Sequence, residues 1–264
     1  MTIYYVHFVD YEPLAMVGDG MRWDDLTDRD VWLMFLNRGG PQRARERMQE
    51  RLQVLDEFGV PVSWCVDTWW PHNQWLYFNA EMLAERQAIG DTISPHFHWV
   101  EWVKEADDPN ESPDYAPGLG KWHPRQQPTR QLFDDTYRDG IQAFDRMGLT
   151  SGTIIRSGWC SQEFADGSPI WPEYDRIGWR GCADFRHGGV KWHGDFLLLG
   201  YNNRDLDGPI IVHYEHVPSD AKEDNRLRRR LASWRTRFGD DFKPITADGL
   251  YDALQHNRQP QRSA

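Results

Sequence analysis

Segments with the character of β-strands alternate with segments of helical periodicity along most of this sequence, and this alternation constrains the fold more than any other feature. Residues 3–10 are rich in β-branched and aromatic side chains, as strands are. In the segment 41–58 apolar residues recur at helical spacing, with Pro41 suited to a first turn and Gly59 to a C-cap. Alternation of this kind is typical of parallel β–α units.

The same pattern continues toward the C-terminus. Further strands are predicted at 60–66, 91–99, 153–156, 180–184, 195–199 and 210–216. Further helices are predicted to begin near Asn79, Thr129, Trp171, Leu227 and Thr246. The segment 103–128 has no clear periodicity, and a connection of that length in a compact domain is more often a functional loop than an accident.

The chain has 264 residues, a length that suits one α/β barrel. It contains no internal repeat and no glycine-rich phosphate-binding motif, so nucleotide-binding α/β folds lose support. We therefore predict a single (β/α) barrel domain over residues 1–255, with its site at the C-terminal ends of the strands. The polar residues 256–264 are predicted to form a flexible tail.

Composition excludes several classes of function. The formal net charge is −11, and the only basic cluster is Arg228–Arg230, which argues against a nucleic-acid surface. No apolar run is long enough to span a bilayer, and the first residues do not resemble a signal peptide, so a cytoplasmic location is expected. The three cysteines suggest neither disulfides nor a cysteine zinc site. The fourteen tryptophans exceed what a core of this size requires.

Ionisable residues stand at the ends of five predicted strands: Asp10 and Glu12, His96 and His98, Arg156, Asp184, and His213 to His216. Side chains at positions i and i+2 of a strand point the same way, so Asp10 and Glu12 can aim at one point, and so can His96 and His98. Carboxylate and imidazole groups together form the ligand set of a catalytic divalent metal.

Each of these patterns has an ordinary structural interpretation. A His-x-His pair taken alone is more often two half-exposed strand residues than a ligand pair. An Asp-x-Glu sequence before proline is often a turn with helix-capping carboxylates, and Arg156 suits an ordinary ion pair. Five strand ends with the same chemistry are improbable as random surface polarity, so the constellation as a whole favours a site.

The order of these elements resembles the polysaccharide deacetylase superfamily, the NodB-like, carbohydrate esterase family 4-like enzymes of the glycoside hydrolase/deacetylase barrel type. The segments that carry the resemblance are HFVDYEP, AIGDTISPHFHW, IIRSGW, GCADFR and IIVHYEH, in the order of the family's five motifs. The His-x-His form is similar to the branch that acts on capsule or O-antigen polysaccharide. The resemblance spans residues 3–255 and implies an irregular, seven-stranded barrel.

This resemblance also implies roles for particular residues. Asp10 is implied as the general base and Glu12 as a metal ligand, with the opposite assignment open. The implied remaining ligands, to a divalent metal such as zinc, are His96 and His98. The resemblance further implies that Arg156 orients the base and that His213 protonates the leaving amine. Asp184 and His216 are second choices for this acid, and the strand period places His216 on the face opposite His213.

The implied reaction is metal-dependent hydrolysis of an amide C–N bond, most simply N-deacetylation of an amino sugar in a polysaccharide or its precursor. The carbohydrate is the implied partner, and the sequence does not define an oligomeric state. Two alternatives are a hydrolase of another C–N bond on the same barrel and a metal-free carbohydrate-binding relative, since the family's adjacent Asp-Asp pair is missing and Val100 stands four residues after His96. Five tryptophans near strand ends are predicted to form a sugar-stacking wall: Trp69, Trp70, Trp99, Trp102 and Trp159.

Overall fold

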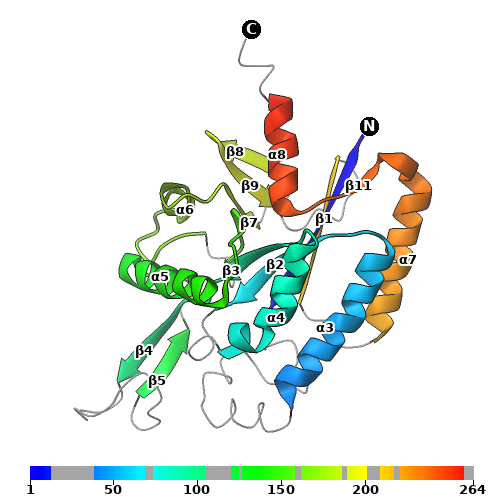
Figure 1. Cartoon of the computed structure of the whole chain (residues 1–264). Helices are drawn as coiled ribbons and strands as arrows, with labels where there is room; N and C mark the ends of the chain where they lie inside the picture. The colour runs from blue at the N-terminus through cyan, green and yellow to red at the C-terminus, as the bar shows by residue number, and fades with distance from the viewer. Residues whose placement is uncertain are drawn as a thin grey trace.

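The computed structural model describes most of the chain. The described residues are 1–12, 39–68, 74–104, 120–124, 127–157, 162–185, 189–200, 209–216 and 221–258. Within them, six α-helices surround two β-sheets and a separate β-hairpin (Figure 1).

Parallel strands form the central sheet. Its members are β1 (Ile3–Tyr11), β2 (Val62–Asp67), β3 (Thr92–His96), β10 (Ile210–His216) and β11 (Phe242–Pro244). The order is β10-β1-β2-β3, and β11 pairs with the start of β1. Because all these strands are parallel, the residues that follow β1, β2, β3 and β10 meet at one edge.

A second sheet continues this arrangement. It contains β6 (Ile154–Ile155), β7 (Gly181–Phe185), β8 (Val190–His193) and β9 (Phe196–Gly200), in the order β6-β7-β9-β8. Only β8 runs antiparallel to its neighbour within this sheet. The amide of Gly152 donates to the carbonyl of Ile93 at 2.6 Å, so the chain entering β6 runs parallel to β3 and links the two sheets.

Helices cover both sheets. They are α3 (Gly40–Glu57), α4 (Gln74–Ala88), α5 (Arg130–Met147), α6 (Trp171–Arg176), α7 (Ala221–Phe238) and α8 (Ala247–Arg258), with a 3₁₀ turn at Gly239–Asp241. Helices α3 and α7 pack side by side (Figure 1). The predicted start of α5 at Thr129 is confirmed, because the Thr129 side chain accepts from the Leu132 amide. Gly148, in the left-handed conformation with φ 68°, ends the helix.

The structure confirms most predicted elements and corrects several. Part of the segment predicted as an irregular loop forms an antiparallel hairpin of β4 (Val100–Lys104) and β5 (Gly120–Pro124), which does not pair with either sheet among the described strands. Helix α4 begins at Gln74, so Asn79 lies inside it and does not cap it. Helix α8 continues to Arg258, so the first residues of the predicted tail are helical.

Tryptophan contributes much of the buried core. Trp64, Trp75 and Trp99 are among the largest fully buried side chains, and Trp179 is also buried. The Trp75 indole donates to the carbonyl of Tyr11 at 2.9 Å, so its polar atom is satisfied inside the core. These four tryptophans serve packing, which accounts for part of the tryptophan excess in the sequence.

Asp91 organises the contact between β2 and its helices. It is 5% exposed, and its oxygens accept hydrogen bonds from the Val62 amide at 2.9 Å and the Trp64 indole at 2.8 Å. The Arg86 guanidinium donates to the same carboxylate at 2.7 Å and reaches Asp56 on α3 at 2.8 Å. Asp91 and Arg86 together therefore join β2, α4 and α3.

Replacing Asp91 with Ala is expected to lower the free energy of unfolding by about 3–5 kcal/mol, because Arg86 would be left as a buried charge without its main partner. Urea denaturation of the purified protein measures the change. The matched control is Asp139→Ala on α5, where the side chain is 69% exposed, and stability should stay nearly unchanged. A loss no larger than that of the control would contradict this role for Asp91.

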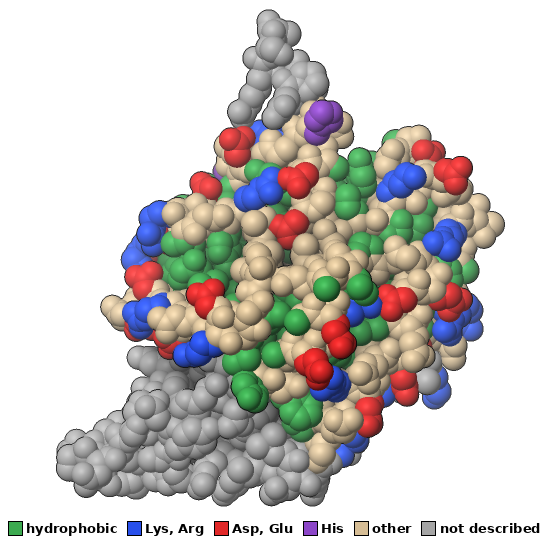
Figure 2. Space-filling view, viewed as in Figure 1, with side chains coloured by type: hydrophobic (Ala, Val, Ile, Leu, Met, Phe, Trp, Pro, Cys, Tyr) green, Lys and Arg blue, Asp and Glu red, His purple; other side chains and the backbone are tan. Residues whose placement is uncertain are grey.

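The described strands do not show a closed barrel. Among them, no ladder joins β10 to β8 or β9. None of the helices in the described ranges has the length and apolar character needed to cross a bilayer. On the face drawn in Figure 2, acidic and basic side chains are interspersed and form no extended patch of one charge.

Candidate functional site

The carboxyl ends of the parallel strands carry a cluster of buried polar side chains. Asp10 is the last residue but one of β1 and Glu12 directly follows the strand, and both are almost fully buried, at 2% and 1% exposed. His96 ends β3, and His98 lies two residues further along at 3% exposed. The alternation of side chains along β1 places both carboxylates on one face, as the sequence predicts.

Arg156 holds Asp10 in place. Its Nε lies 3.0 Å from both carboxylate oxygens of Asp10, and its Nη1 donates to the Ala183 carbonyl at 3.1 Å. Arg156 directly follows β6, and its side chain is 2% exposed. These charge-assisted hydrogen bonds fix the orientation of the buried carboxylate, so the two residues lie in contact, as a residue that orients the base requires.

Glu12 lies between two histidines. Its Oε2 is 2.5 Å from the Nε2 of His98 and 3.6 Å from the Nε2 of His96. Burial alone would raise the pKa of Glu12, but the charge of His98 and hydrogen bonds from His216 and His98 outweigh it and hold this pKa well below its usual range. The same contact raises the pKa of His98, although burial opposes the rise.

The His96 ring has a defined tautomer. Its Nδ1 lies 2.9 Å from the carbonyl of Arg156, which can only accept, so Nδ1 carries the proton. Burial lowers the pKa of His96 to about 4, so the ring is neutral at neutral pH. Its Nε2 lone pair then faces the carboxylates of Asp10, at 3.8 Å, and Glu12.

A lone pair facing two carboxylates is unfavourable unless a cation lies between them. The nearest ligand atoms of Glu12, His96 and His98 all lie within 4.8 Å of one another. A hydrogen bond from the second ring nitrogen to a backbone carbonyl is the usual way in which proteins orient a metal-binding histidine. The donor set and its orientation therefore fit a divalent transition metal.

The structure places His216, a second choice in the sequence analysis, beside this cluster. Its Nε2 lies 2.9 Å from Oε1 of Glu12, and its Cα is the ladder partner of Asp10. Burial lowers the pKa of His216, but the hydrogen bond to Glu12 and its charge have the larger effect and raise it. Protonated imidazole at this position faces the same space as Asp10.

His213 does not join the cluster, which corrects its assignment as the acid. It lies on the opposite face of β10, stacked on His7 with ring centroids 4.9 Å apart. Glu215 lies on that face too and contacts the Nε2 of His7 at 2.8 Å, the Nε2 of His213 at 3.4 Å and the Nε of Arg51 at 3.3 Å. The physical reason is the period of two along the strand, which brings His216 to the site and turns His213 away.

This second cluster also has ligand atoms within 4.8 Å of one another. However, Arg230 approaches the Nδ1 of His213 at 3.3 Å, and a guanidinium can only donate. Nδ1 of His213 is therefore the acceptor, and Nε2 is the donor directed at Glu215. Arg51 supplies the positive charge beside this carboxylate, so the cluster is a structural network.

The Glu215 network predicts a pH-dependent contribution to stability. Burial raises the pKa of Glu215, but the charge of His7 and hydrogen bonds from His213 and His7 lower it far more. A carboxyl whose folded pKa lies below its unfolded value of about 4.3 stabilises the fold above that pH and loses this contribution as pH falls. Glu215→Gln should therefore be destabilising at pH 7, and the deficit should shrink as pH falls below about 4.

Urea unfolding of the Glu215→Gln variant and the parent protein, repeated between neutral and acid pH, measures this deficit. The control is Glu85→Gln, at an exposed position on α4, which should show no such pH dependence. A deficit that is constant with pH would contradict the ionised state of Glu215.

Asp67 is a further buried carboxylate that the sequence analysis did not assign to the site. It ends β2, is the ladder partner of His96 and is 0% exposed. Its charge contributes to raising the pKa of His98. Its position in the sequence could have identified it as a site residue, because Asp67 stands at the end of β2 as Asp10 stands near the end of β1.

Of the five tryptophans in the predicted aromatic wall, only the side chain of Trp99 lies in the described part of the structure. Trp99 is fully buried and packs against Phe97 and Phe133 under α5, which corrects its assignment as a sugar-stacking residue. A side chain that already packs on both neighbours in the core presents no free face to a ligand. The side chains of Trp69, Trp70, Trp102, Trp159 and Asp184 lie outside the described part of the structure.

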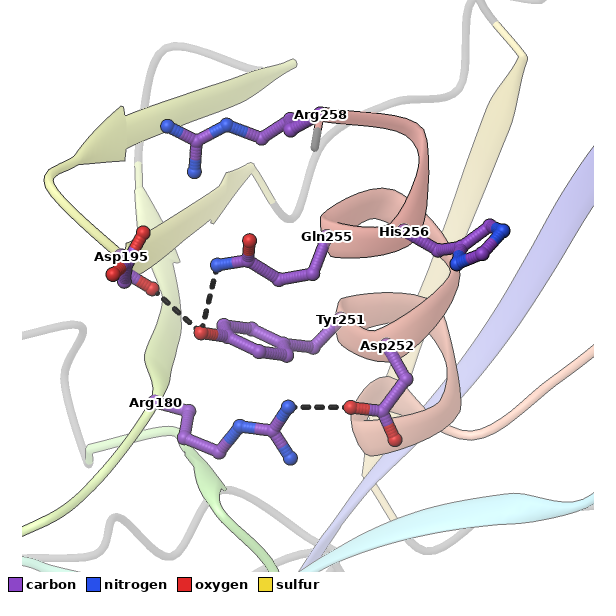
Figure 3. Close-up of a pocket in the computed structure, with 7 residues that line it drawn as sticks. All are labelled: Arg180, Asp195, Tyr251, Asp252, Gln255, His256 and Arg258. Carbon is purple, nitrogen blue, oxygen red and sulfur yellow. Dashed lines mark hydrogen bonds and ion pairs between the residues drawn. The ribbon is translucent and has the colours of Figure 1, made fainter. Parts of the chain in front are cut away.

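A cavity of about 480 Å³ lies at the other end of the second sheet (Figure 3). It is lined by residues of α8 together with Arg180 and Asp195, which precede β7 and β9. The Tyr251 hydroxyl donates to the Asp195 carbonyl at 2.8 Å, and Arg180 pairs with Asp252. Because these residues lie at the amino ends of the strands, the cavity is separate from the cluster around Glu12.

Comparison with known structures finds proteins of similar fold, whereas comparison of sequences does not find a match. Neither protein-family models nor curated protein sequences give a match. A crystal structure from Mycobacterium smegmatis, provisionally assigned as a polysaccharide deacetylase, aligns with a TM-score of 0.59 at 13% identity, over 97% of this chain and 92% of its own. The catalytic domain of a peptidoglycan N-acetylglucosamine deacetylase from Eubacterium rectale aligns at 0.47 and 15% identity, over 94% and 90% of the two chains. The first alignment shows that this chain has a deacetylase-type α/β fold.

Proposed function

We propose that this protein is a metal-dependent N-deacetylase of an amino sugar in a polysaccharide or its precursor. The observation that carries the proposal is the neutral His96 ring, whose Nε2 lone pair faces Asp10 and Glu12 in a buried site. The fold shared with the Mycobacterium smegmatis protein, and the polysaccharide deacetylase name of that protein, support the substrate class. We also propose that the parallel strands β10, β1, β2, β3, β6, β7 and β9 form an irregular seven-stranded barrel over residues 1–255.

We assign the ligands as Glu12, His96 and His98, and zinc as the metal. When bound, such an ion supplies Lewis acidity toward an amide carbonyl and lowers the pKa of water. Glu12 is the ligand and Asp10 the base, because the nearest ring nitrogens surround Glu12 whereas Arg156 binds Asp10. The sequence alone leaves the opposite assignment open.

Two side chains, those of Asp10 and His216, carry out the proton transfers. Asp10, oriented by Arg156, accepts a proton from the water that adds to the acetamido carbonyl carbon. His216 then donates a proton to the amide nitrogen as the C–N bond breaks, which releases acetate and a free amine. Asp10 and His216 are partners in the β1–β10 ladder, so acid and base act on the same substrate from adjacent strands.

The test is release of acetate from N-acetylhexosamine oligosaccharides by the purified protein loaded with zinc. The expected result is one free amine for each acetate released. Hydrolysis of a cyclic amide without acetate release would favour the alternative of another C–N hydrolase on this fold. Sugar binding without hydrolysis of any amide would favour a carbohydrate-binding relative.

A further inference from the structure

Tyr214 lies at the centre of the candidate site although neither the motifs nor the comparisons assign it a role. It is on β10 two residues before His216, so the strand period turns both side chains to the same face. Its Cα is the ladder partner of Phe8, two residues before Asp10 on β1. The Tyr214 side chain therefore lies on the same face of the sheet as Asp10 and His216, two residues before His216 along β10.

The ring of Tyr214 supports Arg156. The guanidinium carbon lies 3.7 Å from the ring centroid, which is a close cation–π contact. The edge of the same guanidinium is occupied by Asp10 and by the Ala183 carbonyl. The ring therefore completes the set of contacts that fixes Arg156, and Arg156 in turn fixes the carboxylate of Asp10.

The hydroxyl of Tyr214 contacts His216. Its oxygen lies 3.0 Å from Nε2 and 3.3 Å from Nδ1 of the imidazole, and the two rings meet edge to face with centroids 5.2 Å apart. The His216 side chain is 42% exposed and sits at the end of its strand, so its ring is less restrained by packing than the other site histidines. The hydroxyl and Glu12 together restrict its rotation.

We propose that Tyr214 is a positioning residue that couples the two proton-transfer groups, its ring holding Arg156 against Asp10 and its hydroxyl holding His216 over the site. The roles of Asp10 as base and His216 as acid come from the proposed function, and this proposal rests on them. It also rests on the contacts of this one side chain with Arg156, which binds Asp10, and with His216. Positioning of this kind matters because small displacements of catalytic groups lower the reaction rate strongly.

Two substitutions separate the two contacts. Tyr214→Phe removes the hydroxyl and keeps the ring under Arg156, so kcat should fall about tenfold while KM changes little and metal content does not change. Tyr214→Leu removes the ring as well, so kcat should fall about a hundredfold. The matched control is Tyr251→Phe, whose hydroxyl lies in the distant cavity of Figure 3 and whose loss should leave kcat unchanged.

A second readout does not depend on activity. The ring ¹⁵N signals of His216, assigned with the His216→Gln variant, should shift in Tyr214→Phe and stay in place in Tyr251→Phe, because ring nitrogen shifts report hydrogen bonding and tautomer. A purely structural role for Tyr214 would lower the melting temperature without altering the His216 signals or kcat per folded molecule, and that result would overturn the proposal. If the parent protein releases no acetate, the proposed function fails, and the His216 signals still decide whether Tyr214 positions this ring.

Discussion

Replacing Asp10 with Asn is expected to lower kcat for acetate release by about 10²- to 10⁴-fold, the usual contribution of a general base. Asparagine keeps the size of the side chain but cannot accept a proton from water. It also replaces a buried charge-assisted contact with Arg156 by a neutral one. Because Glu12, His96 and His98 are unchanged, the variant should still bind one metal ion per chain.

Two measurements on the Asp10→Asn variant decide the role of this residue: steady-state kinetics and metal content of the purified protein. Asp252→Asn is the control, since that carboxylate pairs with Arg180 at the far end of the second sheet and should be kinetically silent. Loss of both metal and activity in Asp10→Asn would instead identify Asp10 as a ligand. Activity equal to the parent would remove Asp10 from the mechanism.

Replacing His96 with Ala is expected to abolish metal binding at micromolar zinc and acetate release with it. His96 supplies the only ring among the three ligands whose Nε2 already faces the carboxylates as a lone pair, so no side-chain movement is needed for it to bind. Removal leaves two ligands, fewer than catalytic zinc sites use. Isothermal titration with zinc and the acetate assay measure the two losses separately.

His193→Ala is the matched control for this substitution. His193 ends β8 and stacks on Trp171 with centroids 4.2 Å apart, away from the carboxyl ends of the central strands. The control should bind one zinc ion as tightly as the parent does. Full zinc binding by His96→Ala would show that the metal is held elsewhere.

Local patterns were sufficient to predict much of the fold. The β-branched and aromatic composition of residues 3–10 predicted β1, which is buried almost throughout, and apolar residues at helical spacing predicted α3 and α5, which each bury one face. The β4–β5 hairpin was not predicted because its short strands, which include Glu101 and Lys104, show no apolar alternation. The strand β11 is only three residues long and is defined by its pairing with β1, which is a long-range contact.

The site was predictable as far as strand ends specify it. Asp10, Glu12, His96, His98 and Arg156 converge because parallel strands end at one edge. The choice between His213 and His216 depended on which face of β10 is turned to the site, and that face is set by the ladder with β1. The sequence of one strand does not show which of its two faces is turned to the site, because the pairing with the neighbouring strand determines it.

Contacts across the site explain what the sequence could not. Tyr214 was not selected because the local sequence does not distinguish a tyrosine ring packed in the core from one packed against a guanidinium. Trp99 was assigned to a ligand wall because it follows His98, but its side chain packs in the core beside Phe133. Both outcomes depend on residues that lie more than thirty positions away in the chain.

The most direct test of the central claim is acetate release measured as zinc is added stepwise to protein first stripped with a chelator. We predict that stripped protein releases no acetate from an N-acetylhexosamine oligosaccharide, and that activity rises linearly and saturates at one zinc ion per chain. Acetate release by the stripped protein, or a zinc-loaded protein that hydrolyses no N-acetyl group, would contradict the account.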